Sequence, residues 1–185
     1  IYCVGPNYRS QALEMGANPD REPPFFFMKP SDAVRDDGSI IAYPPATQDL
    51  HHEVELVVAI GRGGVAIAAR MALAYVFGYA VGLDMTRRDL QFALRDKRRP
   101  WDISKGFDCS APISPIKPIA ATGEITTAQI WLAVNGAKRQ SSDVAKLIWN
   151  IGETIEHLSR AIRLDNDKKA TLYAHFYLGL VYLER

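Results

Sequence analysis

The chain has 185 residues and a mass of 20.6 kDa, and 48% of its residues are hydrophobic and 23% charged. This composition is typical of one globular domain with a hydrophobic core. The net charge of +1 gives no basic field, so it argues against nucleic acid or a membrane surface as the main partner.

Cysteine usage and hydropathy give a first indication of the compartment. Cys3 and Cys109 are the two cysteines and form no CxxC motif, so we expect no disulfide framework and a reduced, cytoplasmic setting. The longest uncharged apolar stretch, Met71–Leu83, is too short to span a bilayer, and no signal peptide is visible. The chain opens at Ile1 without a methionine, which suggests a missing upstream segment.

The first fifty residues predict short strands separated by loops. Ile1–Val4 has strand character, and Tyr8–Met15 favours a short helix. A proline-rich loop then leads to Phe25–Met28, whose phenylalanines we expect in the core. Asp36-Asp37-Gly38 predicts a turn into a strand over Ile40–Tyr43.

Two apolar runs dominate the middle of the chain. The β-rich run His51–Ile60 ends at Gly61–Gly64, a segment that lacks the lysine of a phosphate-binding loop and that we interpret as a hairpin-like loop. Alanine-rich Ala66–Val76 predicts a helix, Gly78–Asp84 a buried strand, and Thr86–Lys97 a helix with charged side chains toward solvent.

The C-terminal part changes from strand to helix. Ile130–Val134 followed by Asn135-Gly136 predicts a β-hairpin, because Asn-Gly suits a type I′ turn. Leu147–Ile162 predicts an amphipathic helix, and the rest of the chain has helical character. The fold class expected is therefore mixed α/β and mainly β.

Three acidic residues stand at the two central runs. Glu53 and Glu55 are two positions apart in a β-rich run, so both carboxylates project to the same face, and Asp84 closes the next run. Like charges beside a core are costly unless something neutralises them. A divalent cation with oxygen ligands is the simplest answer, and three carboxylates would complete one face of an octahedral site.

Short motifs also stand in order along residues 1–159 and resemble those of a known enzyme family. They are Tyr2-Cys3-Val4-Gly5, Asn7-Tyr8, Arg21-Glu22-Pro23-Pro24-Phe25-Phe26-Phe27, Lys29-Pro30, His52-Glu53-Val54-Glu55-Leu56, Gly78-Tyr79, Gly82-Leu83-Asp84-Met85-Thr86-Arg87-Arg88-Asp89, Pro100-Trp101, Lys105-Gly106-Phe107-Asp108, Val134-Asn135-Gly136, Ile148-Trp149-Asn150-Ile151 and Glu153-Thr154-Ile155. This ordered set resembles the fumarylacetoacetate hydrolase family, and more narrowly its fumarylpyruvate and acylpyruvate hydrolase branch.

The resemblance implies a fold, a reaction and a metal. Such enzymes have a rolled, mostly β structure of mixed sheets and are usually homodimers. They bind Mg²⁺ or Mn²⁺, with Ca²⁺ as an alternative, and cleave a carbon–carbon bond in small-molecule 1,3-diketo acids. By resemblance, Glu53, Glu55 and Asp84 would be the metal ligands. The metal would then act as a Lewis acid for the enolate of the departing pyruvate.

Further residues match family positions near the substrate. Lys105 and Arg88 would hold a carboxylate or the developing enolate charge, which makes Lys105 both a catalytic and a substrate-binding candidate. Gln91, one helical turn beyond Arg88, would present its side-chain amide on the same face.

Plainer interpretations stand beside these. An isolated Glu-x-Glu is more often a solvated face of a strand than a metal site. His51 and His52 have suitable chemistry but face opposite ways as strand neighbours, so both are left out of the metal site. Arg87 and Arg88 could be surface charges of a helix, and Lys105 has no structural signal of its own.

The chain departs from the family pattern at a short lid helix. There the family carries a histidine and, three residues later, a glutamate that together activate water, whereas this chain has Gln11 and Glu14. Glutamine cannot accept a proton, so Glu14 would be the remaining catalytic group. Because general base catalysis contributes ~10²–10⁴-fold, the rate could fall by that order.

A second departure begins at about residue 160. The family continues through a Pro-Gly-Asp segment into a Thr-Gly-Thr-Pro loop that lines the substrate site, and this chain has neither after Ser159. Residues 160–185 instead resemble part of a tetratricopeptide repeat, with Leu178-Gly179 and Tyr182 at its spacing. The expected organisation is thus an incomplete hydrolase-like domain over residues 1–159 and a helical tail over residues 160–185, by fusion, truncation or artefact.

Two classes of function are consistent with these patterns. The first is a metal-dependent hydrolase of fumarylpyruvate-like diketo acids in aromatic catabolism, impaired in this copy. The second is a non-catalytic relic or interaction protein with a metal-binding core. Family members that decarboxylate or isomerise oxo-acids give a further alternative within the first class.

Overall fold

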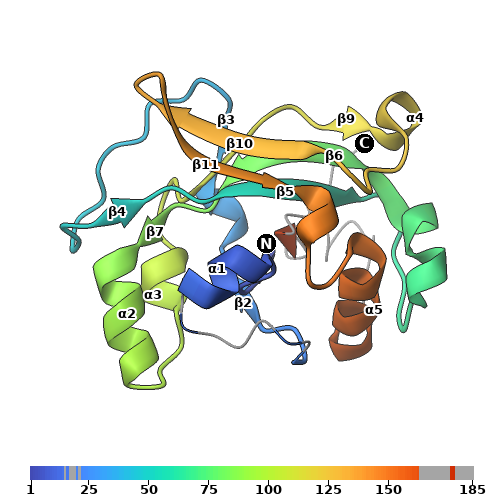
Figure 1. Ribbon diagram of the computed structural model, residues 1–185, viewed down its shortest axis with the longest axis horizontal. Helices are drawn as coiled ribbons and strands as arrows, with labels where there is room; N and C mark the ends of the chain where they lie inside the picture. Colours follow the sequence, from blue (N-terminus) through green and yellow to red (C-terminus); the bar gives the residue numbers. More distant parts are fainter. Residues whose placement is uncertain (15, 17–19, 21, 163–175, 178–185) are drawn as a thin grey trace.

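The computed structural model describes residues 1–162, except 15, 17–19 and 21, together with residues 176 and 177. For residues 11, 14, 176 and 177 the description is of the backbone alone. Strands cross the centre of the molecule, and short helices surround them (Figure 1). The expected mixed α/β fold, mainly sheet, is confirmed.

The central sheet is built on the two apolar runs. Strands β5 (Val54–Ile60) and β6 (Val76–Leu83) pair antiparallel, and the sheet continues in the order β3 (Val34–Asp36), β8 (Ala111–Ile113), β6, β5. The short β9 (Lys117–Pro118) also pairs with β6.

Both faces of β5 are covered, which explains its uninterrupted apolar sequence. Val57 packs into one hydrophobic cluster with Ile1, Cys3 and Ala111. Val58 points the other way, into a larger cluster with residues of α5 (Ile151–Ala161). Because successive strand residues face opposite sides, one apolar run serves two cores.

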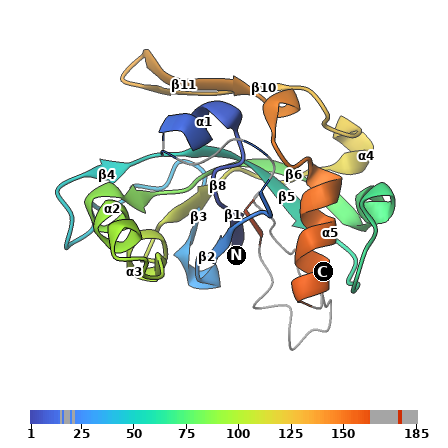
Figure 2. The ribbon, with the colours of Figure 1, turned by 60° about the horizontal axis from the view of Figure 1, so that its bottom comes forward.

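A second, smaller sheet lies beneath the first. Strand β1 (Tyr2–Val4) pairs antiparallel with β2 (Phe26–Met28) and parallel with β12 (Phe176–Tyr177). Figure 2 shows β1 and β2 below the central sheet, with α1 (Arg9–Glu14) between them and the hairpin β10–β11.

The hairpin confirms the prediction from Asn135-Gly136. Strands β10 (Gln129–Val134) and β11 (Ala137–Asp143) are joined by these two residues, whose φ values of 51° and 78° suit a type I′ turn. The register shifts between Leu132 and Ala133, which pair with Gln140 and Lys138. Arg139 is therefore an extra, unpaired residue, a β-bulge in β11.

Helical segments cover the edges of the sheets. The longest is α5, which begins with a capping box between Asn150 and Glu153 and packs against the 3₁₀ segment η2 (Ala69–Tyr75). The other segments are α2 (Arg88–Asp96), α3 (Asp102–Lys105), α4 (Ile119–Thr122), the 3₁₀ turns η1 (Ser31–Ala33) and η3 (Val144–Lys146), and the paired short strands β4 (Leu50–His51) and β7 (Thr86–Arg87). No helix among these described segments has the length and apolar character needed to cross a bilayer.

Several expectations from the sequence need correction. Ile40–Tyr43 forms no strand, and Ile40 is 97% exposed because no neighbouring strand pairs with this segment. Phe25 is 52% exposed instead of buried, since its ring packs against Trp101 at the edge of the fold. The helix expected from Leu147 begins at Ile151, after the Asn150 cap.

The tetratricopeptide-like tail expected over residues 160–185 falls largely outside the described residues. Residues 160 and 161 still belong to α5. Phe176 and Tyr177 form β12, which pairs with β1 as a strand. The remainder of the expected helical tail is not among the residues that the structure describes.

Candidate active site

Two buried acids meet where β5 and β6 come together. Glu53 directly precedes β5 and Asp84 directly follows β6, and the Asp84 N–H donates to the Glu53 carbonyl at 2.8 Å. Their exposed fractions are 5% and 3%. The antiparallel pairing of β5 with β6 therefore places two carboxylates side by side in the interior.

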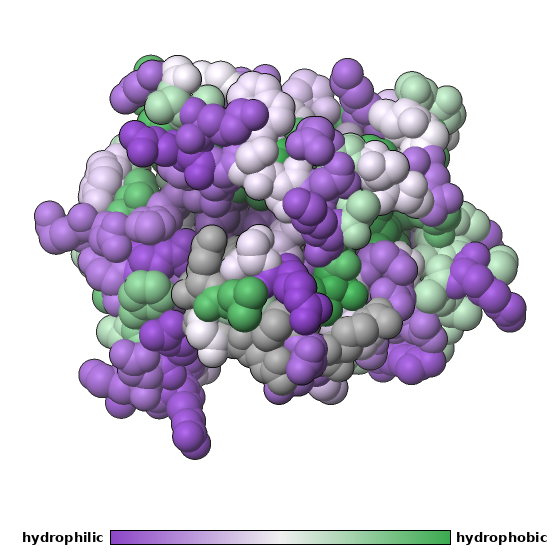
Figure 3. Space-filling model, in the orientation of Figure 1, coloured by the Kyte–Doolittle hydropathy of each residue, from purple (hydrophilic) through white to green (hydrophobic). Residues whose placement is uncertain are grey.

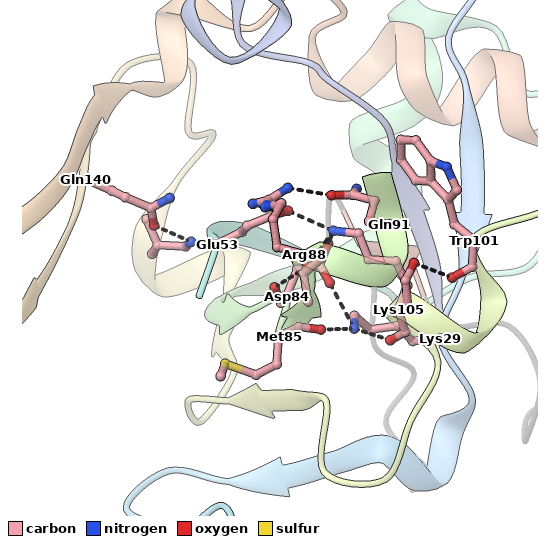
Figure 4. Close-up of polar contacts among 12 residues, drawn as sticks. Lys29, Glu53, Asp84, Met85, Arg88, Gln91, Trp101, Lys105 and Gln140 are labelled. Carbon is pink, nitrogen blue, oxygen red and sulfur yellow. Dashed lines mark hydrogen bonds and ion pairs between the residues drawn. The ribbon is translucent and has the colours of Figure 1, made fainter. Parts of the chain in front are cut away.

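Lys105 supplies the main counter-charge to these acids. Its Nζ donates to Glu53 Oε2 at 2.8 Å, to Asp84 Oδ2 at 2.6 Å and to the Thr86 hydroxyl at 2.7 Å (Figure 4). The residue ends the short helix α3, whose Ser104 and Lys105 N–H groups both donate to the Trp101 carbonyl. Sequence patterns gave no sign of this helix, and it is the element that carries Lys105 inward.

Lys29 is a second buried cation, which sequence reasoning left without a role. Its Nζ lies 2.8 Å from Asp84 Oδ1 and donates to the Met85 carbonyl at 2.9 Å and to the Lys105 carbonyl. Lys29 thus links the end of β6 to the end of α3. A lysine after an apolar run is ordinarily exposed, so the sequence carries no local signal for this burial, which depends on the distant segments that carry Asp84 and Lys105.

Arg88 and Gln91 form the outer part of the same polar network. Arg88, at the start of α2, donates through Nη2 to Glu53 Oε1 and through Nη1 to Gln91 Oε1, both at 2.5 Å. Gln91 is 2% exposed. The prediction that Gln91 shares a helix face with Arg88 is confirmed, whereas Arg87 faces elsewhere and stacks its guanidinium on Phe107.

The charges in this cluster shift one another's pKa values. Burial acts to lower the pKa of Lys105, but the carboxylates of Asp84 and Glu53 outweigh it and raise that pKa, so the side chain remains an ammonium. Burial acts to raise the pKa of Asp84, but Lys105 and Lys29 hold it below its usual range. For Lys29, burial prevails and lowers the pKa despite the neighbouring Asp84.

Glu55 differs from the other two acids. Among the described residues no hydrogen bond reaches its carboxylate. Burial and the nearby charges of Glu53 and Asp84 raise its pKa well above the usual range. The site therefore contains a carboxylate that lacks a partner and is repelled by two others.

Two cavities open onto Glu53 and Glu55. The inner one, of about 20 Å³, is lined by Val4, Gly5, Pro6, Phe27, Glu53, Glu55, Arg88, Gln91, Trp101 and Lys105. The outer one, of about 380 Å³, shares Glu53 and Glu55 with it and extends between α1 and the hairpin β10–β11. A small molecule held at the acids could therefore extend outward under the hairpin.

A family comparison agrees with this geometry. The family model described as "Fumarylacetoacetate (FAA) hydrolase C-terminal" matches residues 1–167. The chain belongs to the fumarylacetoacetate hydrolase family.

Individual relatives within this family differ in reaction. The fumarylpyruvate hydrolase of Ralstonia sp is 45% identical over 138 residues, which is 75% of this chain and 71% of the relative. The mitochondrial oxaloacetate tautomerase FAHD1 of Rattus norvegicus is 39% identical over 165 residues, 89% of this chain and 74% of the relative. A crystal structure of fumarylpyruvate hydrolase from Pseudomonas aeruginosa in complex with Mn²⁺ and pyruvate superposes with a TM-score of 0.85 at 53% identity, over 88% of this chain and 72% of that one.

The predicted metal ligands Glu53, Glu55 and Asp84 can be compared with what a bound metal ion requires. Among the described residues, no three histidine, cysteine, aspartate or glutamate side chains gather their ligand atoms around one point, and the Lys105 ammonium stands between Glu53 and Asp84. The donor types nevertheless fit a hard divalent cation. The unpartnered, mutually repelled carboxylate of Glu55 is the kind of group that such a cation stabilises.

The remaining residues singled out from the sequence either lie away from this cluster or have side chains that the structure does not describe. The backbones of Gln11 and Glu14 belong to α1, and their side chains are outside the described part of the structure. His51 pairs with Asp49 at 2.9 Å and is about half exposed. Cys3 and Cys109 are both free, as expected.

Proposed function

We propose that this chain binds Mg²⁺ or Mn²⁺ and hydrolyses a carbon–carbon bond in a 1,3-diketo acid of the fumarylpyruvate or acylpyruvate type. Glu53, Glu55 and Asp84 would hold the cation, with Ca²⁺ as an alternative. The bound cation would supply Lewis-acid stabilisation of an enolate oxygen. The observation that carries this proposal is the buried cluster of acids and cations at the inner cavity.

The charge balance of the cluster supports an anionic substrate. Glu53, Glu55 and Asp84 are matched in number by Lys29, Arg88 and Lys105, so the cluster is neutral when all its members are ionised. A divalent cation would leave two excess positive charges in a buried place. The carboxylate of a 2-keto acid and the enolate oxygen that forms beside it would neutralise them, whereas an uncharged ketone would not.

The neighbouring side chains have roles that follow from their protonation. Lys105 stays protonated, so it can stabilise developing negative charge but cannot serve as the base. Arg88 can bind a substrate carboxylate while Gln91 holds its guanidinium in place. For the base we retain Glu14, and because Gln11 cannot relay a proton we infer slow turnover in this chain.

Tautomerisation of an oxo-acid is the second candidate activity. It breaks no carbon–carbon bond and needs no activated water, so Gln11 would hinder it less than hydrolysis. The identity to oxaloacetate tautomerases over 89% of the chain supports this alternative. Following the enol and keto forms of oxaloacetate by ultraviolet absorbance, with and without the protein, separates the two activities.

Metal binding is the first step to test. We expect Mn²⁺, titrated and followed by the loss of its free-ion electron paramagnetic resonance signal, to bind the wild type and to bind Glu53→Gln at least tenfold more weakly. The control Glu124→Gln removes an exposed acid that lines neither cavity of the site. Equal Mn²⁺ binding by the wild type and Glu53→Gln would reject the metal site.

Turnover is the second step. We expect the Mn²⁺-loaded chain to cleave fumarylpyruvate slowly and Gln11→His to be faster by ~10²–10⁴-fold, the usual contribution of a general base. Binding of Mn²⁺ and oxalate without cleavage by either protein would instead favour the non-catalytic alternative. The homodimer, the cytoplasmic setting and a place in aromatic catabolism remain parts of the same proposal.

A further inference from the structure

The outer cavity contains polar groups that the proposed chemistry does not use. One wall carries Glu53 and Glu55, and Ile130 also lines the space. The other wall consists of Tyr8 and Ser10 on the side of α1, and Arg139, Gln140, Ser141 and Ser142 on β11. Figure 3 looks onto this side of the molecule, where hydrophilic surface lies between the hairpin and α1.

The hairpin wall is fixed relative to the acids. Gln140 Oε1 accepts a hydrogen bond of 2.9 Å from the N–H of Val54, the residue between Glu53 and Glu55 (Figure 4). Strand β11 is thereby attached directly to the start of β5. Any group that β11 presents to the cavity has a defined position relative to the carboxylates.

Arg139 is the extra residue of the β-bulge in β11. Leu132 pairs with Gln140 and Ala133 with Lys138, so Arg139 has no partner across the hairpin. A bulge turns the side chain of its extra residue away from the regular alternation of the strand. In this hairpin the redirected residue is an arginine, and it lines the cavity.

The charge of Arg139 is available to a ligand. Among the described residues its guanidinium takes part in no ion pair or hydrogen bond. Its neighbour Lys138 behaves differently, because its ammonium lies 5.5 Å from the centre of the Trp131 ring and the residue does not line the cavity. The hairpin thus carries two adjacent cations, of which one faces the cavity.

A second polar group in the cavity also lacks a partner. The Tyr8 hydroxyl is buried and makes no hydrogen bond within the described part of the chain, although Tyr8 lines the same space. Burial, with the charges of Glu55 and Asp143, raises the pKa of Tyr8, so the hydroxyl keeps its proton and can donate it in a hydrogen bond. A buried hydroxyl without a hydrogen bond lowers the stability of the fold unless a ligand or a water molecule supplies the missing partner.

We propose that the outer cavity is the subsite for the acyl arm of the substrate, and that Arg139 binds a carboxylate at the far end of that arm with the Tyr8 hydroxyl as a second donor. This inference rests on the proposed function, which places the 2-keto acid end at Glu53, Glu55 and Asp84. The chain would therefore prefer acyl arms that end in a carboxylate to uncharged arms of similar length.

The arrangement of charge in the cavity favours this orientation. The wall with Glu53 and Glu55 repels a carboxylate, whereas the guanidinium on the hairpin wall attracts one and can bind both of its oxygens. Ser141 and Ser142 add hydroxyl groups beside it. An uncharged apolar arm would displace water from this arginine and these hydroxyls without replacing its hydrogen bonds.

Substrate selectivity tests the assignment. We expect Arg139→Gln to lower kcat/KM for fumarylpyruvate by ~10–100-fold, the range for losing a hydrogen bond to a charged group, and to change kcat/KM for acetylpyruvate less than twofold. Lys138→Gln removes the same charge from the same hairpin and should alter neither value by more than twofold. Equal losses on both substrates, or no loss on fumarylpyruvate, would overturn the assignment.

A binding measurement separates this inference from the proposed reaction. Calorimetric titration of the Mn²⁺-loaded protein compares 2-oxoadipate with 2-oxohexanoate, which share the keto acid end and differ in the terminal carboxylate. We expect Arg139→Gln to weaken 2-oxoadipate binding ~10-fold or more, Tyr8→Phe to weaken it less, and neither to change 2-oxohexanoate binding. Arg139-dependent discrimination without any cleavage would support the subsite and reject hydrolysis. Cleavage without that discrimination would reject the subsite.

Discussion

Lys105 donates to Glu53, Asp84 and Thr86 through a single ammonium group, and its own carbonyl accepts from Lys29. Such a residue connects the ends of β5, β6, β2 and α3 through charges that are almost completely buried. Removing one member of a buried ion pair is more damaging than removing the whole pair, because the remaining charge is left without compensation.

We therefore expect Lys105→Met to lower the free energy of unfolding by about 3–5 kcal/mol in the absence of metal. Urea denaturation followed by tryptophan fluorescence measures the change, and Lys138→Met serves as the exposed control. Mn²⁺ should restore part of the loss, because a divalent cation can neutralise Glu53 and Asp84 in place of the ammonium. A loss below about 1 kcal/mol, the level of an exposed pair, would show that these acids do not depend on Lys105.

The residues of the site were predictable from sequence to different degrees. Glu53, Glu55 and Asp84 were found because strand alternation and the end of an apolar run are local signals. Lys29 and Arg139 were not, since their positions depend on which distant elements meet and on one unpaired residue in a hairpin. Phe25 was misplaced because an aromatic residue at the edge of a sheet has the same local sequence as one in its centre.

At the scale of elements, loops are attached to the site by side chains at helix starts. Asp89, in the first turn of α2, accepts from the Thr47 hydroxyl at 2.6 Å and from the Gln48 N–H at 3.0 Å. These bonds attach the loop before β4 to the helix that carries Arg88 and Gln91. On the opposite side, the longer helix α5 holds the segment around η2 through residues within the helix, because Glu156 accepts from the Ala69 N–H and Ser159 from the Ile67 N–H.

The contacts of Asp89 predict a pH dependence. The hydrogen bonds from Thr47 and Gln48 lower its pKa below the usual 3.8. A carboxylate whose pKa is lower in the folded than in the unfolded state stabilises the fold at pH values above its unfolded-state pKa. That contribution disappears as the pH falls through its folded-state pKa. The difference in unfolding free energy between wild type and Asp89→Asn should thus be constant above about pH 5 and shrink below pH 3.8. Chemical denaturation across this range measures it, and a difference that grows toward acid would contradict the interpretation.

The N-terminal cap of α5 predicts a loss of stability when Asn150 is replaced. The Asn150 side chain accepts from the Glu153 N–H at 2.9 Å, and the Glu153 carboxylate accepts from the Asn150 N–H at 3.0 Å. Asn150→Ala should cost about 1 kcal/mol of unfolding free energy, whereas Asn150→Ser should retain most of it. If urea denaturation shows equal losses for both variants, the contribution of Asn150 lies in packing and not in the cap.

For the whole molecule, the strongest local signals agreed with the fold. The hairpin at Asn135-Gly136, the two central strands and α5 were all predicted, because each has a periodicity or turn of its own. Ile40–Tyr43 was predicted as a strand and forms none, because a strand also needs a neighbour with unpaired backbone groups. The short helix α3 was not predicted, because tertiary contacts stabilise it and its own sequence has no helical pattern.

The oligomeric state is a property of the whole molecule that solution measurements can decide. Large apolar side chains stay exposed on strands of different sheets, such as Val81 at 50% and Trp131 at 57%. We expect a homodimer, and hence a light-scattering mass near twice the 20.6 kDa of one chain at tens of micromolar protein. A mass equal to one chain over that concentration range would contradict this expectation.

The bulge at Arg139 has a consequence for how this hairpin can diverge. Because the extra residue has no partner, its deletion would leave every other cross-strand pair intact and restore a regular ladder. The turn at Asn135-Gly136 and the bond from Val54 to Gln140 would keep their positions in the hairpin. Selectivity for the acyl arm could therefore be lost or gained through a one-codon insertion or deletion, without any substitution among the residues that hold the metal.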